Sequence, residues 1–175
     1  MKRILFFLLV AGLLSSCKYL PEQFRRNKQV VEAPIKLPKI AGTWKLLNLE
    51  ARDMAGKVYY PYDEKVQGMA LFNDSTHFSI QYYDATRPAL SQQDPFYCTD
   101  PEIRIAFLSG SAFYGYYEEY PDTLELKIIT GFNPNLQLRK RKYSIQFKGD
   151  TLLMQAPIRR WNGVLLSEHS IWLRE

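Results

Sequence analysis

The side chains in this sequence that are best suited to covalent or metal chemistry are two cysteine thiols and two histidine imidazoles. His77 and His169 lie far apart, and neither stands in a cluster of acidic residues with metal-ligand spacing. The stretch "LSGS" at 108–111 lacks the strand, sharp turn and helix that surround a hydrolase nucleophile. We therefore expect no catalytic constellation, no metal site and no cofactor.

Cys17 is the exception, because it ends an ordered pattern at the start of the chain. Lys2 and Arg3 precede an apolar run over residues 4–14, which is shorter than a membrane-spanning helix requires. The run leads into "LSSC", in which two small residues stand directly before the Cys17 thiol. Small residues let a peptidase approach the backbone, and a thiol can then receive a lipid.

This order resembles the lipobox of a bacterial type II signal peptide. The resemblance implies that residues 1–16 are removed and that Cys17 becomes an acylated first residue. Acyl chains contribute about 0.8 kcal/mol per buried methylene, so several of them form a firm membrane anchor. Lys18 and Tyr19 follow Cys17, and neither is the aspartate of an inner-membrane signal. This resembles the pattern of lipoproteins that are sorted to the outer membrane. We expect a lipid-anchored protein of the cell envelope, on either the periplasmic or the outer face.

Two segments follow the predicted signal peptide. Residues 17–39 hold three prolines and no sustained periodicity, which indicates a lipidated N-terminus and a flexible tether. Residues 40–175 have the usual size of one domain.

Removal of Lys2 and Arg3 lowers the formal net charge from +5 to +3, which argues against a nucleic-acid partner. We expect a monomer. Cys98 then has no internal disulfide partner, and its role stays open.

Short runs rich in Tyr, Phe, Ile, Leu and Thr alternate with turn signals throughout the domain. This pattern predicts an all-β antiparallel barrel or sandwich. A short helix is expected near residues 100–109, where Thr99 or Asp100 can cap it and Pro101 occupies its first position.

Several motifs occur in the order found in bacterial lipocalin-like domains, and the resemblance covers residues 40–175. These motifs are "GTWKL" from Gly42, "YYPY" at 59–62, Arg87-Pro88, "FYGYY" at 113–117, "GDTLLM" at 149–154 and the closing "IWLRE". The resemblance implies an up-and-down β-barrel of about 8–10 strands. It also implies that Trp44 plugs the barrel floor, that Gly42 lets the backbone bend there, and that Arg174 packs across the indole. These three residues are expected to close the barrel rather than to catalyse.

The cavity of such a barrel would be lined by inward residues of several strands. The segment 76–83 allows two registers, with either His77, Ser79, Gln81 and Tyr83 or Phe78, Ile80 and Tyr82 inside. Gly115 either leaves room for a ligand or marks a bulge, and Arg87 either binds a carboxylate at the mouth or is a surface residue. The candidate ligand-binding residues are Leu46, Glu50, Ser79, Gln81, Tyr83, Arg87, Phe113 and Tyr117.

Two functions from different classes remain open at this point. The barrel could bind a small hydrophobic or amphipathic molecule, which would require a cavity of about 300 Å³ or more. Alternatively, it could be filled by its own side chains and act as a structural or accessory lipoprotein that binds a protein partner. An enzymatic role is the weaker third possibility, because the sequence offers no paired acid and base.

Overall fold

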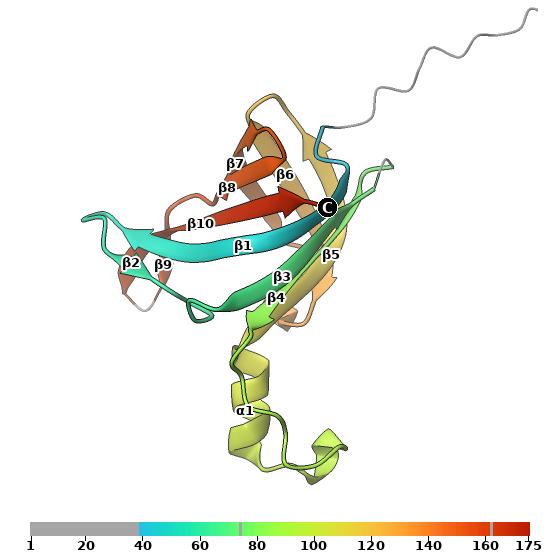
Figure 1. The fold of residues 1–175 in the computed structure, drawn as a ribbon, viewed down its shortest axis with the longest axis vertical. Helices are drawn as coiled ribbons and strands as arrows, with labels where there is room; N and C mark the ends of the chain where they lie inside the picture. Colours follow the sequence, from blue (N-terminus) through green and yellow to red (C-terminus); the bar gives the residue numbers. More distant parts are fainter. Residues whose placement is uncertain (1–38, 74, 162) are drawn as a thin grey trace, which may run out of the picture. The chain divides into compact units, whose positions relative to one another are not determined.

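The barrel contains ten antiparallel strands in a computed structural model that describes residues 39–73, 75–161 and 163–175 (Figure 1). The strands are β1 (Gly42–Asp53), β2 (Val58–Tyr59), β3 (Val66–Phe72), β4 (His77–Asp84), β5 (Gly110–Glu119), β6 (Thr123–Gly131), β7 (Lys140–Lys148), β8 (Thr151–Gln155), β9 (Arg159–Trp161) and β10 (Val164–Arg174). The helical segments are η2 (Pro95–Tyr97), α1 (Asp100–Leu108) and η3 (Pro134–Leu136).

Eight of these strands form the closed wall, in the order β1-β3-β4-β5-β6-β7-β8-β10, and β10 pairs back with β1. Closure removes the exposed edges that an open sheet would present. The short strands β2 and β9 add to β1 and β10 near one end. The predicted all-β, up-and-down barrel with a short helix is therefore confirmed.

The two ends of the barrel differ in their connections. At one end, strands are joined by tight turns, such as Gly149 between β7 and β8, which has a positive φ of 58°. At the other end, longer connections run from β4 to β5 over residues 85–109 and from β6 to β7 over residues 132–139. We call these the closed end and the open end.

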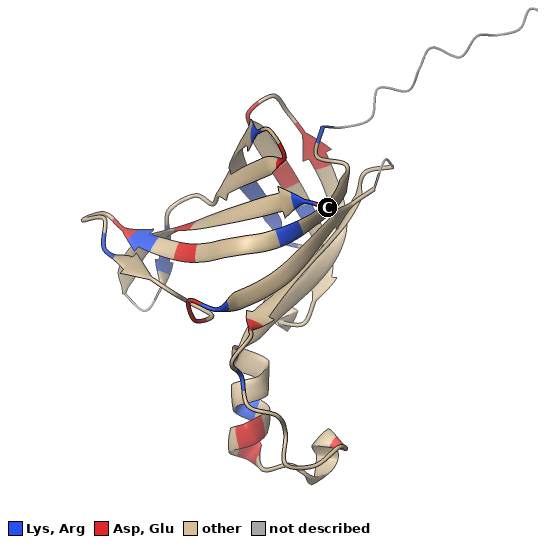
Figure 2. Ribbon diagram, in the orientation of Figure 1, with Lys and Arg blue, Asp and Glu red and all other residues tan. Residues whose placement is uncertain are grey.

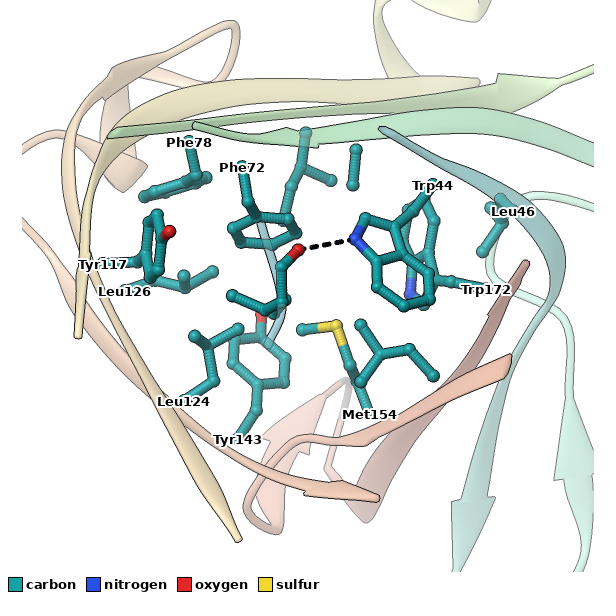
Figure 3. Packing of buried hydrophobic residues seen from close by; sticks show 14 of the residues in the cluster. Trp44, Leu46, Phe72, Phe78, Tyr117, Leu124, Leu126, Tyr143, Met154 and Trp172 are labelled. Carbon is teal, nitrogen blue, oxygen red and sulfur yellow. Dashed lines mark hydrogen bonds between the residues drawn. The ribbon is translucent and has the colours of Figure 1, made fainter. Parts of the chain in front are cut away.

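Apolar side chains fill the interior toward the closed end (Figure 3). Phe72 packs edge-on against Tyr117 at 5.3 Å between ring centroids, and it stacks on Phe78 at 6.1 Å. Trp44 is fully buried, and its indole N–H donates a hydrogen bond of 2.8 Å to the Ile40 carbonyl. Because these rings meet across the barrel axis, no deep chamber remains at this level.

Arg174 spans the ends of the barrel's first and last strands. Its guanidinium carbon lies 4.2 Å from the ring centroid of Trp44, a distance at which a cation over an indole is stabilising. The same group donates hydrogen bonds of 2.7 Å to the Ala41 carbonyl and 2.6 Å to the Lys39 carbonyl. Gly42 has a φ of 134° and leaves room for the guanidinium beside it.

Helix α1 confirms the helix expected near residues 100–109. The Glu102 carboxylate accepts hydrogen bonds from the Thr99 backbone N–H at 2.9 Å and from the Thr99 hydroxyl at 2.7 Å. This reciprocal cap begins the helix after Thr99. None of the helical residues is buried, and Figure 1 shows α1 extending away from the barrel. No helix among the described residues has the length and apolarity needed to cross a membrane.

The contact between Gly42 and Arg174 yields a stability prediction. A Cβ at position 42 would lie 2.7 Å from Nη1 of Arg174, and the φ of 134° disfavours any side chain. Gly42→Ala should lower the free energy of unfolding by about 2 kcal/mol or more, measured by urea denaturation. Gly56→Ala is the matched control, because Gly56 also has a positive φ but faces open space. Equal losses in the two variants would contradict a role for the Arg174 contact.

Candidate functional site

A cavity of about 280 Å³ lies at the open end of the barrel, above the filled core. Its wall combines apolar side chains with tyrosines and three charged groups. The apolar residues include Ala51, Leu108, Leu136 and Leu166, and the polar ones include Tyr62, Tyr82, Arg141, Arg159 and Glu168. Apolar walls with a few converging polar groups are the usual composition of a small-molecule site.

The charged groups come from two neighbouring parts of the wall. Arg159 on β9 forms an ion pair of 3.1 Å with Glu168 on β10. Arg141 on β7 points inward with the alternate residue Tyr143, and donates a hydrogen bond of 3.4 Å to the Tyr143 hydroxyl. The Arg141 guanidinium carbon also lies 5.6 Å from the ring centroid of Phe113. The cavity therefore has one guanidinium paired with a carboxylate and another among aromatic rings.

Among these three charged groups, the Arg141 guanidinium has the least complete hydrogen bonding and ion pairing. A guanidinium has five N–H donors, and within the part of the chain that the structure describes Arg141 makes only the bond to Tyr143. Burial disfavours its charge, but Tyr143, Tyr82 and Glu168 raise its pKa above the ordinary value. The group is therefore a permanent cation with donors available to an anion.

Tyrosines form the inner part of the cavity. Tyr62 packs edge-on against Tyr82 with ring centroids 5.0 Å apart, and Tyr82 in turn packs against Phe113 at 6.4 Å. Burial, followed by the charge of Glu168, raises the pKa of Tyr62, Tyr82 and Tyr143. All three phenols stay protonated at neutral pH, and Tyr62 and Tyr82, which line the cavity, can donate hydrogen bonds to a bound molecule.

Three of the predicted cavity residues point into the barrel but belong to its packed core. Leu46, Phe113 and Tyr117 are buried members of one hydrophobic cluster. The Tyr117 hydroxyl donates a hydrogen bond of 2.6 Å to the Asn73 carbonyl at the closed end. Of the three, Phe113 lies closest to the cavity, because Arg141 sits over its ring.

The strand at 76–83 adopts the second of its two possible registers. Phe78, Ile80 and Tyr82 are buried, so the alternate residues point outward. Assigning Ser79, Gln81 and Tyr83 to the cavity was therefore wrong. A filled core favours the register that buries the larger apolar side chains.

Arg87 does not line the cavity either. Its guanidinium carbon lies 4.5 Å from the ring centroid of Tyr83, on the outer surface. Arg87 is exposed, so the alternative of a surface residue is the correct one, and the prediction of a carboxylate contact at the mouth was wrong. Gly115 marks a bulge between β5 and β6, where a Cβ would lie 2.1 Å from the Lys127 carbonyl oxygen.

Glu50 lies on the outer face because β1 contains a bulge at Leu47. The extra residue shifts the alternation by one, so Trp44 and Leu46 point inward, whereas farther along Leu49 points inward. Placing Glu50 in the cavity was therefore wrong. It lines an outer groove of about 410 Å³ with His169, whose pKa is lowered by burial and by the Arg52 charge. The Glu50 carboxylate is already bonded to Arg52 and Asn48.

The sequence-based candidates omitted Arg141, Arg159, Glu168 and Tyr62. One signal for Arg141 was available, because the alternation of "YSIQF" over 143–147, extended back by two residues, places Arg141 on the inward face. Arg159 and Glu168 offered no such signal, since their pairing depends on how β9 adds to β10. Cys17 lies outside the described residues.

Comparisons with known proteins place the sequence in a family. A family model described as a lipocalin-like domain matches residues 41–172. No curated protein matches the chain. A crystal structure of an uncharacterized protein from Bacteroides eggerthii is similar at 13% sequence identity, covering 77% of this chain and 98% of that chain with a TM-score of 0.38.

The cavity tyrosines generate a prediction about pH. The pKa of Tyr62 and Tyr82, and that of Tyr143 beside Arg141, is raised above the ordinary value of 10.0, so the folded state favours the neutral phenols. Their contribution to stability should be complete below pH 10 and should be lost as the pH rises toward the folded-state values. Absorbance titration at alkaline pH should show a late-titrating set of tyrosines. Because Glu168 raises these pKa values, Glu168→Gln should lower them, and an unchanged titration curve would contradict the role of Glu168.

Proposed function

This chain belongs to the family of lipocalin-like domains, and we propose that it is an envelope lipoprotein whose barrel binds a small amphipathic anion. The ligand occupies the cavity at the open end. Its charged group meets Arg141, and its apolar part lies against Leu108, Leu136 and Leu166. Cys17 carries the lipid that anchors the protein.

The observation that carries this proposal is the incompletely bonded Arg141 guanidinium in a cavity of mixed apolar and polar lining. A half-buried guanidinium with unused N–H donors is costly, and a carboxylate or phosphate would complete its hydrogen bonding. The tyrosines of the cavity supply further neutral donors. Glu168 repels anions, but it is already paired with Arg159.

The volume of the cavity limits the size of the ligand. At about 280 Å³ it lies just below the range for ligand pockets, roughly 300–1,000 Å³. The filled core prevents a long chain from entering deeply. The proposed ligand is therefore small, or it inserts only its charged group and the adjoining methylenes.

The filled core also favours a second candidate function. A barrel packed by its own rings at the closed end suits a rigid accessory lipoprotein that binds an envelope partner through its outer face. The outer groove beside Glu50 and His169 is the natural place for such a contact. Failure of every amphipathic anion to bind the cavity would favour this candidate.

A charge-matched pair of probes tests the ligand-binding proposal. Decanoate should displace the amphipathic fluorophore anilinonaphthalene sulfonate from the purified protein, whereas decanol should do so far less well. Arg141→Gln should weaken decanoate binding about tenfold or more, because a hydrogen bond to a charged group contributes about 1.5–3 kcal/mol. Displacement isotherms followed by fluorescence give both affinities.

Lys142→Gln serves as the control, because Lys142 is the exposed, outward-facing neighbour of Arg141. Its affinity for decanoate should equal that of the wild type. Equal displacement by decanoate and decanol, or an Arg141→Gln variant with full affinity, would contradict an anion site in the cavity.

The anchor has its own test. Cys17→Ser removes the thiol that would be acylated, so the protein should move from the membrane fraction to the soluble fraction of bacterial cells. Mass spectrometry of the wild-type protein should find a chain that begins at Cys17 and carries fatty acyl groups. Cys98→Ser is the matched control and should leave both results unchanged. A Cys17→Ser protein that stays in the membrane fraction would contradict lipid anchoring.

A further inference from the structure

The β4–β5 connection carries several large apolar side chains that are exposed in the described part of the chain. In η2, Phe96 is 95% exposed and Tyr97 is 78% exposed. In α1, the large apolar residues Ile103, Ile105, Phe107 and Leu108 are also exposed. Contiguous exposed apolar surface on a folded domain usually marks an interaction site.

The apolar surface continues from α1 onto the rim of the barrel. Phe107 packs against Phe132 of the β6–β7 connection, with ring centroids 4.8 Å apart. Leu138, in the same connection, is 80% exposed. Leu108 lines the cavity itself, so the apolar surface reaches the cavity mouth. We call this set the rim surface: Phe96, Tyr97, Phe107, Phe132 and Leu138.

Positive charge borders the barrel end of the rim surface, whereas the projecting segment itself carries Asp94, Asp100 and Glu102 together with Arg87 and Arg104. Residues 132–142 and 156–163, which connect strands at the open end and begin β7, hold six basic and no acidic residues. Arg139, Lys140 and Lys142 are exposed directly after Leu138. The Nζ atom of Lys140 lies 3.8 Å from Oε1 of Glu125, so the charge of Lys140 is partly balanced. Figure 2 shows basic segments on β7 and β9 and acidic ones on α1. The combination of aromatic side chains and flanking bases suits the interface of an anionic membrane.

We propose that the rim surface docks onto an anionic phospholipid bilayer. Its most exposed rings lie on a projecting segment (Figure 1), which can insert into a soft interface without needing a complementary pocket. Anionic headgroups would meet Arg139, Lys140 and Lys142. A protein partner would need a matching concave apolar groove, and the charges alone would attract only an acidic one.

The proposed lipid anchor is compatible with this orientation. The chain between Cys17 and Lys39 can span at most about 75 Å, which is enough to reach past a small domain. A lipid chain and a second contact together bind a membrane more firmly than one lipid chain alone. Docking would also turn the cavity mouth toward the bilayer, so that an amphipathic ligand could pass between them; this last step rests on the proposed function.

The experiment uses the chain from Cys17 onward with Cys17→Ser, which removes the acylation site and leaves Cys98 as the only thiol. An environment-sensitive fluorophore on Cys98 would report on the surroundings of Phe96 and Tyr97. The protein is mixed with vesicles of phosphatidylcholine alone or of equimolar phosphatidylcholine and phosphatidylglycerol, without decanoate. Co-sedimentation measures affinity, and unlabelled protein checks that the label does not cause binding.

We expect binding to the mixed vesicles that weakens with salt, together with a blue shift of the Cys98 label. Phe96→Ser/Tyr97→Ser should lower the affinity about tenfold or more, because two rings no longer enter the interface. Lys140→Gln/Lys142→Gln should lower the affinity about tenfold for the mixed vesicles only. The control is Leu47→Ser/Leu71→Ser, which alters two apolar residues on the barrel wall that are 51% and 46% exposed and should bind normally.

Three results would overturn the proposal. The first is an absence of binding to mixed vesicles by folded protein, judged by circular dichroism. The second is full affinity in Phe96→Ser/Tyr97→Ser. The third is self-association in solution that is lost in this variant without any vesicle binding, which would assign the rim surface to a second copy of the chain. Decanoate binding is measured without vesicles, so failure of membrane docking and failure of the ligand proposal are distinguishable.

Discussion

The guanidinium of Arg174 joins the segment before the first strand to the end of the last strand. It covers the ring of Trp44 and binds two carbonyls, those of Lys39 and Ala41. Because β1 and β10 must pair to close the barrel, this contact lies where an open sheet would otherwise end. Trp44 then provides the surface against which the apolar residues of the closed end pack, and the open end is left for polar and charged groups.

The division between the two ends follows from simple constraints. Tight turns hold neighbouring strands close together, and large rings then fill the interior between them. At the open end, longer connections carry side chains that the wall does not enclose. Arg141 can therefore lie among rings with most of its donors unused, and Glu168 can be satisfied by Arg159. The barrel thus combines a closed end filled by apolar side chains with an open end whose polar groups are accessible.

The sequence predicted the barrel, the short helix and the residues that meet at the closed end, because ordered motifs and strand periodicity extend along the whole domain. The prediction of which individual side chains point into the barrel failed at some positions, for physical reasons. One extra residue at Leu47 reversed the alternation and moved Glu50 outside. The register of Ser79 depended on whether the core is wet or filled, which periodicity alone does not decide. The inward position of Arg141 was recoverable from the alternation of the residues that follow it.

The pairing of β1 with β10 also has a consequence for how the barrel forms. The Arg174 contact with Ala41 joins residues separated by 133 positions. Contacts of such high sequence separation form slowly, because a long loop must be ordered before they contribute. The other wall strands pair mostly with sequence neighbours and can associate as hairpins first. Until β10 arrives, the edge of β1 that it later covers is unpaired, so the incomplete barrel has an interval of exposure to aggregation that the folded protein lacks.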